Sequence, residues 1–180
     1  MATTLKDWDS KSELMTHLMD LKDDKQPYVL IGEDAEAPRR FCSLSFEDRT
    51  GQCLEIALIM SFHGIEPSWT TSVDGESIAI GHDLSVSIID AAQSRVVAVR
   101  RLDGAFYGFV ATDRPDEILV CHELGVVKMN FLGDELWSVH TTDILLKWIV
   151  PPNGTLVLRQ WGDEKELVID MRTGNRVLGG

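Results

Sequence analysis

Residues 117–140, EILVCHELGVVKMNFLGDELWSVH, decide the fold class of this chain. They divide into three short apolar runs separated by two tight turns, Glu123-Leu124-Gly125 and Leu132-Gly133-Asp134. Short apolar runs bounded by glycine and acidic residues are typical of neighbouring antiparallel strands. We therefore interpret the stretch as a three-stranded meander.

The same order of runs and turns recurs along the chain. Two further copies lie at 77–101 and 155–179, and a more degenerate one lies at 28–58. The equivalent turn positions are 43, 39 and 41 residues apart, at Gly51, Ser94, Gly133 and Gly174. A fixed period near 40 residues with several strands per period is typical of propeller blades.

One more apolar segment precedes each of the last three units, at 69–73, 106–111 and 144–150. These segments supply an innermost strand, which gives about four strands per blade. The first unit has no obvious inner strand, so the sequence leaves open whether four units close into a ring or form an open stack. An open stack would expose sheet edges, through which two copies could pair as a homodimer.

Several residues give the units a family resemblance. They are the strand-end residues Asp90 and Asp170, the Arg-Thr-Gly turns 49–51 and 172–174, and the segment 133–137. On these positions, residues 28–180 resemble blades of quinoprotein-like and WD-type β-propellers. Quinoprotein enzymes have more blades around a cofactor funnel, and the WD-type Gly-His and Trp-Asp pairs do not repeat here. Because such folds have many unrelated functions, the resemblance implies architecture alone.

The N-terminal segment has the sequence pattern of one amphipathic helix. Ser10-Lys11-Ser12-Glu13 has the form of a capping box, and leucines follow at helical spacing until Pro27. We expect a helix near 11–23, with residues 1–9 polar and loosely held. The predicted fold is all-β: about four propeller-like blade repeats, closed or open, preceded by one helix. We expect one domain over 1–180, divided into an N-terminal segment 1–26 and a β body 27–180.

The excess of acidic over basic residues indicates which classes of partner the chain could bind. Lys and Arg total 17 against 29 Asp and Glu, a formal net charge of -12 spread over the chain. This disfavours nucleic acid and anionic membranes and favours a basic protein partner. The three cysteines, Cys42, Cys53 and Cys121, have no metal-type spacing, and the N-terminus has no apolar targeting run. We therefore expect reduced buried thiols and a cytoplasmic protein.

Four of the five histidines follow second or fourth strands of the expected blades, and such strand ends emerge on one face of a propeller. The expected face contains His63, His82, Asp83, His122, Glu123, His140 and Asp143, with Glu66 near His63. It could hold a divalent metal ion or respond to pH. The alternative is that loop histidines recur with the repeat and have no further role.

The tryptophans, like the histidines, could have either a structural or a binding role. Trp69, Trp137 and Trp148 fall within expected strands, where they pack in the core or between blades. Trp161 lies at a turn among polar residues, where it could be an exposed interface anchor or pack against the turn.

The sequence contains no G-x-S-x-G elbow, no phosphate-binding glycine loop and no Cys-His pairing visible by spacing. We therefore favour a non-enzymatic, acidic protein-binding module without a cofactor. A concrete form is an immunity or inhibitor protein that masks a basic toxin or enzyme. One alternative is a metal-dependent enzyme or metal-binding protein that uses the histidine face. Another is a structural subunit that completes a larger propeller by dimerisation.

Overall fold

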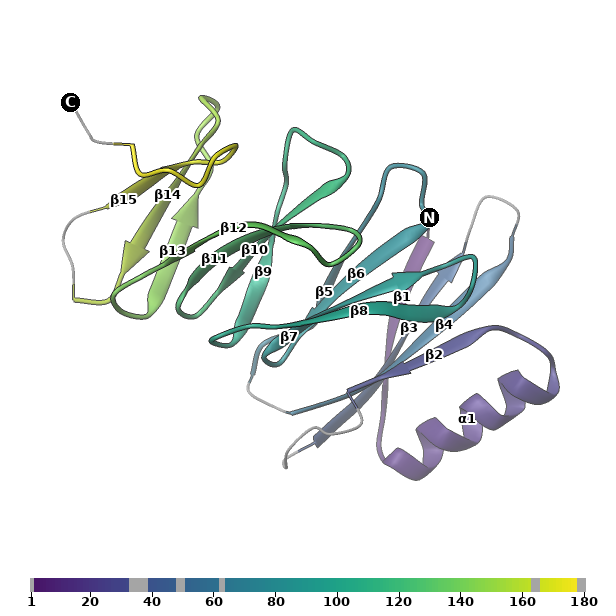
Figure 1. The fold of residues 1–180 in the computed structure, drawn as a ribbon. Helices are drawn as coiled ribbons and strands as arrows, with labels where there is room; N and C mark the ends of the chain where they lie inside the picture. The colour runs from purple at the N-terminus through teal and green to yellow at the C-terminus, as the bar shows by residue number, and fades with distance from the viewer. Residues whose placement is uncertain (1, 33–38, 48–50, 62–63, 163–165, 178–180) are drawn as a thin grey trace.

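The computed structural model describes residues 2–32, 39–47, 51–61, 64–162 and 166–177. The strands form four sheets of three or four strands each, which stand in a row in chain order (Figure 1). One helix, α1 (Lys11–Asp23), lies at the N-terminal end of the row. The all-β architecture, with four sheets of three or four strands and one N-terminal helix, agrees with the sequence prediction.

The first sheet differs from a blade in its connections. Its strand order is β1-β3-β4-β2, and β2 runs parallel to β4 whereas the other pairs are antiparallel. Its strands are β1 (Ala2–Trp8), β2 (Tyr28–Ile31), β3 (Arg39–Glu47) and β4 (Cys53–Ser61).

The prediction that 28–58 forms a degenerate blade by itself was therefore wrong in its strand pairing. The crossover through α1 brings β2 to the far edge of the sheet running in the same direction as β1, and it therefore pairs with β4 in parallel. The expectation that residues 1–9 are loosely held was also wrong. Their backbone pairs with β3 along seven residues, from Ala2 opposite Glu47 to Trp8 opposite Phe41.

The helix begins and ends as the sequence indicates. The Ser10 hydroxyl accepts a hydrogen bond of 3.2 Å from the Glu13 backbone N–H, and the Asp9 N–H donates to the Glu13 carboxylate at 3.3 Å. The bond to the Ser10 hydroxyl is one half of the predicted capping box, whereas the Glu13 carboxylate reaches back to Asp9, one residue before the N-cap. Leu14 and Leu18 are buried against one face of the first sheet, so α1 covers that face.

The second, third and fourth sheets are antiparallel meanders. The stretch 117–140 forms three of the four strands of the third sheet, as predicted, and β9 adds the expected inner strand. The bounds of the second sheet are β5 (Ser68–Thr71), β6 (Ser77–His82), β7 (Ser85–Asp90) and β8 (Arg95–Arg101). Those of the third are β9 (Phe106–Val110), β10 (Glu117–His122), β11 (Gly125–Asn130) and β12 (Glu135–His140). Those of the fourth are β13 (Leu145–Ile149), β14 (Thr155–Gln160) and β15 (Leu167–Asp170).

The four turn positions that set the sequence period share one backbone conformation. Their φ angles are positive: 83° at Gly51, 51° at Ser94, 91° at Gly133 and 73° at Gly174. Residues with side chains rarely adopt this region. At Gly133 a Cβ atom would also lie 2.5 Å from the Cβ of Ala98 in the neighbouring sheet. The period therefore reflects a turn geometry that glycine satisfies best.

Buried apolar clusters join each sheet to the next one only. Leu44 and Ile78 belong to the cluster between the first and second sheets, Ile88 and Val120 to the next, and Leu158 to the last. Among the described residues no buried cluster joins the fourth sheet to the first, and the two sheets lie at opposite ends of the row (Figure 1). The row is therefore an open stack, and α1 covers an end rather than a gap.

Equivalent backbone hydrogen bonds also connect successive sheets. The carbonyl of Asp83 accepts from the N–H of Phe106 at 2.7 Å, and the carbonyl of Glu123 accepts from the N–H of Leu145 at 2.7 Å. In each case the turn after a second strand binds the start of the next inner strand. The same link at two interfaces confirms that these units are structural repeats.

The cysteines agree with the expectation of unpaired thiols. Cys42 and Cys121 are buried, Cys53 is partly buried, and all three are free. Burial raises the pKa of the Cys42 thiol to about 12. The α-helix found in the described chain is too short and too polar to cross a membrane.

Candidate functional site

The structure places the expected histidine face along one edge of the stack, which we call the histidine edge. The described residues there are His82, Asp83, His122, Glu123, His140, Asp143 and Trp161. Within each sheet, the turn after the second strand lies beside the end of the fourth strand: the β6–β7 turn beside the end of β8, and the β10–β11 turn beside the end of β12. These residues therefore lie at the same edge of the stack. His63 lies outside the described residues.

His82 is part of the packing rather than of the surface. Its side chain is 5% exposed, and Nδ1 lies 3.4 Å from Asp83 Oδ2. The same carboxylate oxygen accepts from the Ser61 N–H at 3.0 Å, so the turn is tied to the first sheet. The neighbouring sheet therefore covers the His82 side chain, which does not contribute to the exposed surface of the histidine edge.

His122 occupies the equivalent position one sheet later and is also buried, at 3% exposed. Burial lowers the pKa of its imidazole, and nearby Asp103 and Glu123 oppose that shift in part. The neighbouring Glu123 carboxylate accepts from the N–H of Ala105 at 3.3 Å. Burial thus removes the His122 side chain from the expected binding surface, as it does for His82, and favours the neutral form of the ring.

Three other residues of the histidine edge are exposed. His140 has its Nδ1 3.6 Å from Asp103 Oδ2, and the Asp143 carboxylate accepts from the N–H of Ile144 at 2.7 Å. Trp161 is 63% exposed, which favours an available aromatic anchor over turn packing. A hollow of about 220 Å³ adjoins His140 and is lined by Thr141, Thr142, Gln160, Glu166, Leu167 and Arg176.

The described side chains do not assemble a metal-type cluster at this edge. Within the described ranges, no three His, Cys, Asp or Glu side chains come close enough together to hold a metal ion. The spacing of neighbouring blades accounts for this, because equivalent turns are held a sheet-to-sheet distance of roughly 10 Å apart.

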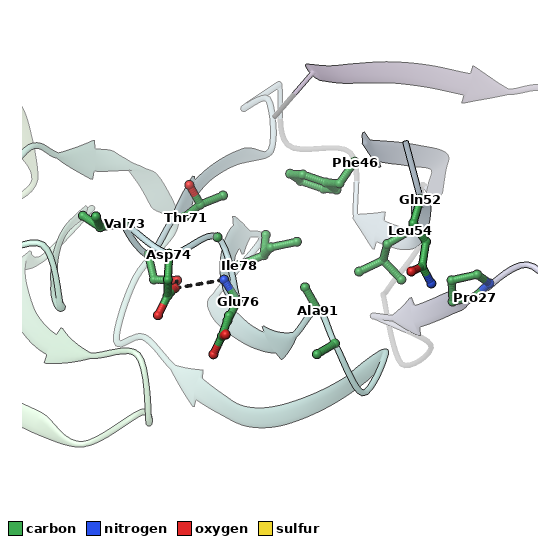
Figure 2. Close-up of a pocket in the computed structure, with 13 residues that line it drawn as sticks. Pro27, Phe46, Gln52, Leu54, Thr71, Val73, Asp74, Glu76, Ile78 and Ala91 are labelled. Atoms are coloured by element: carbon green, nitrogen blue, oxygen red, sulfur yellow. Dashed lines mark hydrogen bonds between the residues drawn. The ribbon is translucent and has the colours of Figure 1, made fainter. Parts of the chain in front are cut away.

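A larger concave feature lies at the opposite edge, between the first and second sheets. We call it the acidic groove; its volume is about 470 Å³. Figure 2 shows its apolar floor, with Phe46 and Leu54 from the first sheet near Ile78 and Ala91 from the second. Pro27, Gln52, Thr71, Ser72, Val73, Asp74, Gly75, Glu76 and Ala92 complete the lining.

The charged residues that line the groove come from the β5–β6 turn. Asp74 Oδ1 accepts from the Ser72 hydroxyl at 2.5 Å and from the Glu76 N–H at 2.9 Å (Figure 2). The hydrogen bond from Ser72 contributes most to lowering the pKa of Asp74, so the carboxylate is ionised near neutral pH. None of the described residues that line the groove is basic.

Sequence reasoning missed the acidic groove. Its sequence signal, Asp74-Gly75-Glu76 between two apolar runs, is that of an ordinary exposed turn. The hollow arises because the first sheet packs on the second with a different strand arrangement, and residues from four separate parts of the chain, near 27, 46–54, 71–78 and 91–92, then face one another. The local sequence pattern of each segment does not indicate that these segments pack together.

Comparisons with known proteins support the architecture. No family model and no curated protein matches the sequence. Among solved structures, Kuenenia stuttgartiensis hydrazine synthase superposes with a TM-score of 0.55 at 19% identity, over 84% of this chain and 48% of that one. BamB from Moraxella catarrhalis gives 0.51 at 14% identity, over 80% and 46%. Apo AztD from Citrobacter koseri gives 0.50 at 15% identity, over 84% and 45%.

These neighbours are propeller-type folds, so the likeness supports a propeller-like arrangement of sheets. At such low identity it shows the fold alone. The chain spans about half the length of each of the solved chains.

Proposed function

We propose that this chain is a non-enzymatic module that binds a basic protein, and that the acidic groove receives a lysine or arginine side chain of that partner. Blades that resemble those of quinoprotein-like and WD-type propellers serve as a rigid scaffold for the groove. An immunity or inhibitor protein that masks a basic toxin or enzyme is the concrete form that we favour. The observation that carries the proposal is the groove itself, which combines an apolar floor with two carboxylates at its rim.

The shape of the groove suits a long cationic side chain. Lys and Arg carry an apolar stem and a charged head, and they bury the stem while keeping the head among polar groups. Phe46, Leu54 and Ile78 provide apolar contact for the stem, and Asp74 and Glu76 provide acceptors for the head. A carboxylate that accepts from an ammonium or guanidinium group forms a stronger hydrogen bond than a neutral acceptor does.

Two further properties favour binding by this turn. The internal hydrogen bonds of Asp74 fix the turn before a partner arrives, so less conformational entropy is lost on binding. The net charge of -12 attracts a basic partner from a distance and speeds association at low ionic strength.

The test compares three forms of the chain as bait for the native-host lysate: wild type, Asp74→Asn with Glu76→Gln, and Asp113→Asn with Asp116→Asn. The last pair is a matched control, because these exposed acids occupy the β9–β10 turn, which is equivalent to the groove turn one sheet later. Both double variants remove two negative charges.

We expect mass spectrometry to identify a basic protein that wild type and control retain and that the groove variant loses. Affinities measured with the purified partner should fall at least tenfold for the groove variant, about 1.4 kcal/mol, and less than threefold for the control. Equal retention by all three forms, or failure to retain any basic protein, would contradict the proposal.

A further inference from the structure

The outward face of the fourth sheet carries a row of aliphatic side chains that no described element covers. Ile149 lies opposite Val157, Val157 lies opposite Val168, and the Val177 N–H donates to the Val168 carbonyl at 2.8 Å. We call these four residues the outer row. Ile149 and Val177 are 38% and 42% exposed, and the two central valines are partly buried.

The opposite face of the same sheet is the packed one. The neighbouring positions Trp148, Leu158 and Leu167 form the adjacent row and belong to the cluster shared with the third sheet. Because successive side chains of a strand point to opposite faces, the outer row must face away from the stack.

The outer row corresponds to a row that is covered in the third sheet. The equivalent row of the third sheet consists of Val110, Leu119, Lys128 and Trp137, which lie opposite one another on adjacent strands. The two rows correspond because Leu119 is the third residue of β10 and Val157 is the third residue of β14. Leu119 is fully buried beneath the fourth sheet, and Lys128 donates to the fourth-sheet carbonyl of Met171. The outer row thus repeats a position that elsewhere in the stack is an interface.

The two ends of the stack therefore differ. The first sheet has its outer face covered by α1, so head-to-tail contact with the fourth sheet of another molecule would require displacing the helix. The outer face of the fourth sheet has no such cover among the described residues, and Leu146 and Val150 add exposed apolar area beside it, at 55% and 46% exposed.

Charge around the outer row differs from that of the rest of the chain. The described residues of 144–162 and 166–177 contain four Lys or Arg and two Asp or Glu, whereas the whole chain has a net charge of -12. Two copies can therefore approach through this segment without the repulsion that their other surfaces would produce.

A row of charged side chains, Lys147, Arg159 and Glu166, lies next to the outer row, and its charges would be complementary between two copies of the chain. Lys147 lies opposite Arg159, and the Arg159 guanidinium binds the Glu166 carboxylate at 2.6 Å, so Lys147 and Glu166 flank the central strand. A two-fold axis parallel to β14 exchanges the flanking strands, and it would set Lys147 of each copy over Glu166 of the other.

From these observations we propose that the outer row is a homodimer interface, in which the fourth sheets of two copies pack face to face about a two-fold axis along β14. The contact uses the sheet face rather than the sheet edges. The interface is independent of the acidic groove, which lies between the first two sheets. A three-stranded face is small compared with standard protein interfaces, so we expect a dissociation constant in the micromolar range.

Sedimentation equilibrium of the whole chain at increasing concentration tests the proposal. Wild type should pass from monomer to dimer, and Val157→Glu should remain monomeric because the substitution would bury a carboxylate at the centre of the interface. Val99→Glu is the matched control, since Val99 is 62% exposed in a strand of the second sheet, and it should dimerise like wild type. Circular dichroism and thermal unfolding check that each variant folds.

Two additional variants identify the geometry. With a short thiol-reactive cross-linker, which spans the roughly 10 Å between packed sheets, Val157→Cys should form a covalent dimer because the two copies of this position face each other near the axis. Val99→Cys and wild type should not. Lys147→Glu should weaken dimerisation about tenfold, or 1.4 kcal/mol. A wild type that stays monomeric up to hundreds of micromolar, or a dimer that Val157→Glu leaves intact, would overturn the proposal.

Discussion

Lys128 extends from the third sheet to the fourth, where its ammonium group donates a hydrogen bond of 3.1 Å to the backbone carbonyl of Met171. The side chain is 3% exposed, and it also pairs with the carboxylate of Glu117 on the adjacent strand. Arg114 binds the other oxygen of that carboxylate at 3.3 Å. A buried lysine is stable only with such partners, so the interface between these two sheets depends on a polar contact as well as on packing.

Replacing Lys128 with methionine should destabilise the protein. The variant keeps an unbranched apolar side chain of nearly the same length but leaves Glu117 and the Met171 carbonyl without their buried donor, which should cost about 3 kcal/mol. Urea unfolding measures the loss. Adding Glu117→Gln should recover part of it, because a neutral amide is less costly to bury than a carboxylate. Additive losses would show that the pair is not coupled.

A second prediction concerns the contact between Gly81 and Phe106. A Cβ atom on Gly81 would overlap the ring of Phe106 in the next sheet, so Gly81→Ala should cost about 1–3 kcal/mol through displacement of that ring. Gly108→Ala is the control, since its Cβ would lie 3.5 Å from Trp148, an ordinary contact. The control should be neutral or slightly stabilising in thermal unfolding. Equal losses for both would refute the steric explanation.

The burial of His122 predicts a pH dependence. Burial lowers the pKa of the imidazole below the usual 6.5, so in acid the unfolded chain takes up a proton that the folded protein resists. The free energy of unfolding should therefore fall as the pH drops below about 6.5. His122→Gln should make this dependence shallower, and His140→Gln, at an exposed position, should largely retain it. Unfolding in urea at several pH values from about 5 to 8 measures both.

The helix cap gives a prediction near the N-terminus. Ser10→Ala removes the acceptor for the Glu13 N–H and should cost about 1 kcal/mol of stability. Ser12→Ala is the control, because this neighbouring exposed serine lies inside the helix, where alanine is favourable. Hydrogen exchange of the α1 amides should accelerate in the first variant only. Unchanged exchange would mean that packing of Leu14 and Leu18 alone holds the helix.

The sequence predicted the repeated part of the fold because each blade is encoded locally. Apolar runs of strand length and glycines at turn positions such as Gly133 and Gly174 mark a meander wherever they recur. The first sheet was predicted less well because its pairing is non-local. β2 reaches β4 only after a helix, and the single-sequence pattern of 28–58 does not distinguish a parallel partner from an antiparallel one.

The candidate site was predicted in part for a similar reason. Repeat register correctly placed the histidine-bearing turns on one edge, since that follows from strand direction alone. His82 and His122 are buried because a neighbouring sheet covers them. The adjacent acids, Asp83 and Glu123, give no indication in the sequence that the histidines are buried. Exposure of Trp161 likewise follows from the surrounding turn rather than from its own residue type.

The cover that α1 places on the first sheet has a consequence for synthesis. As the chain leaves the ribosome, the helix can pack on one face of the first sheet and complete that core before the later blades exist. Each following sheet can then pack on an apolar surface that has already formed, since the buried clusters of the described residues join neighbouring sheets. These sheets can thus assemble one after another in chain order during synthesis.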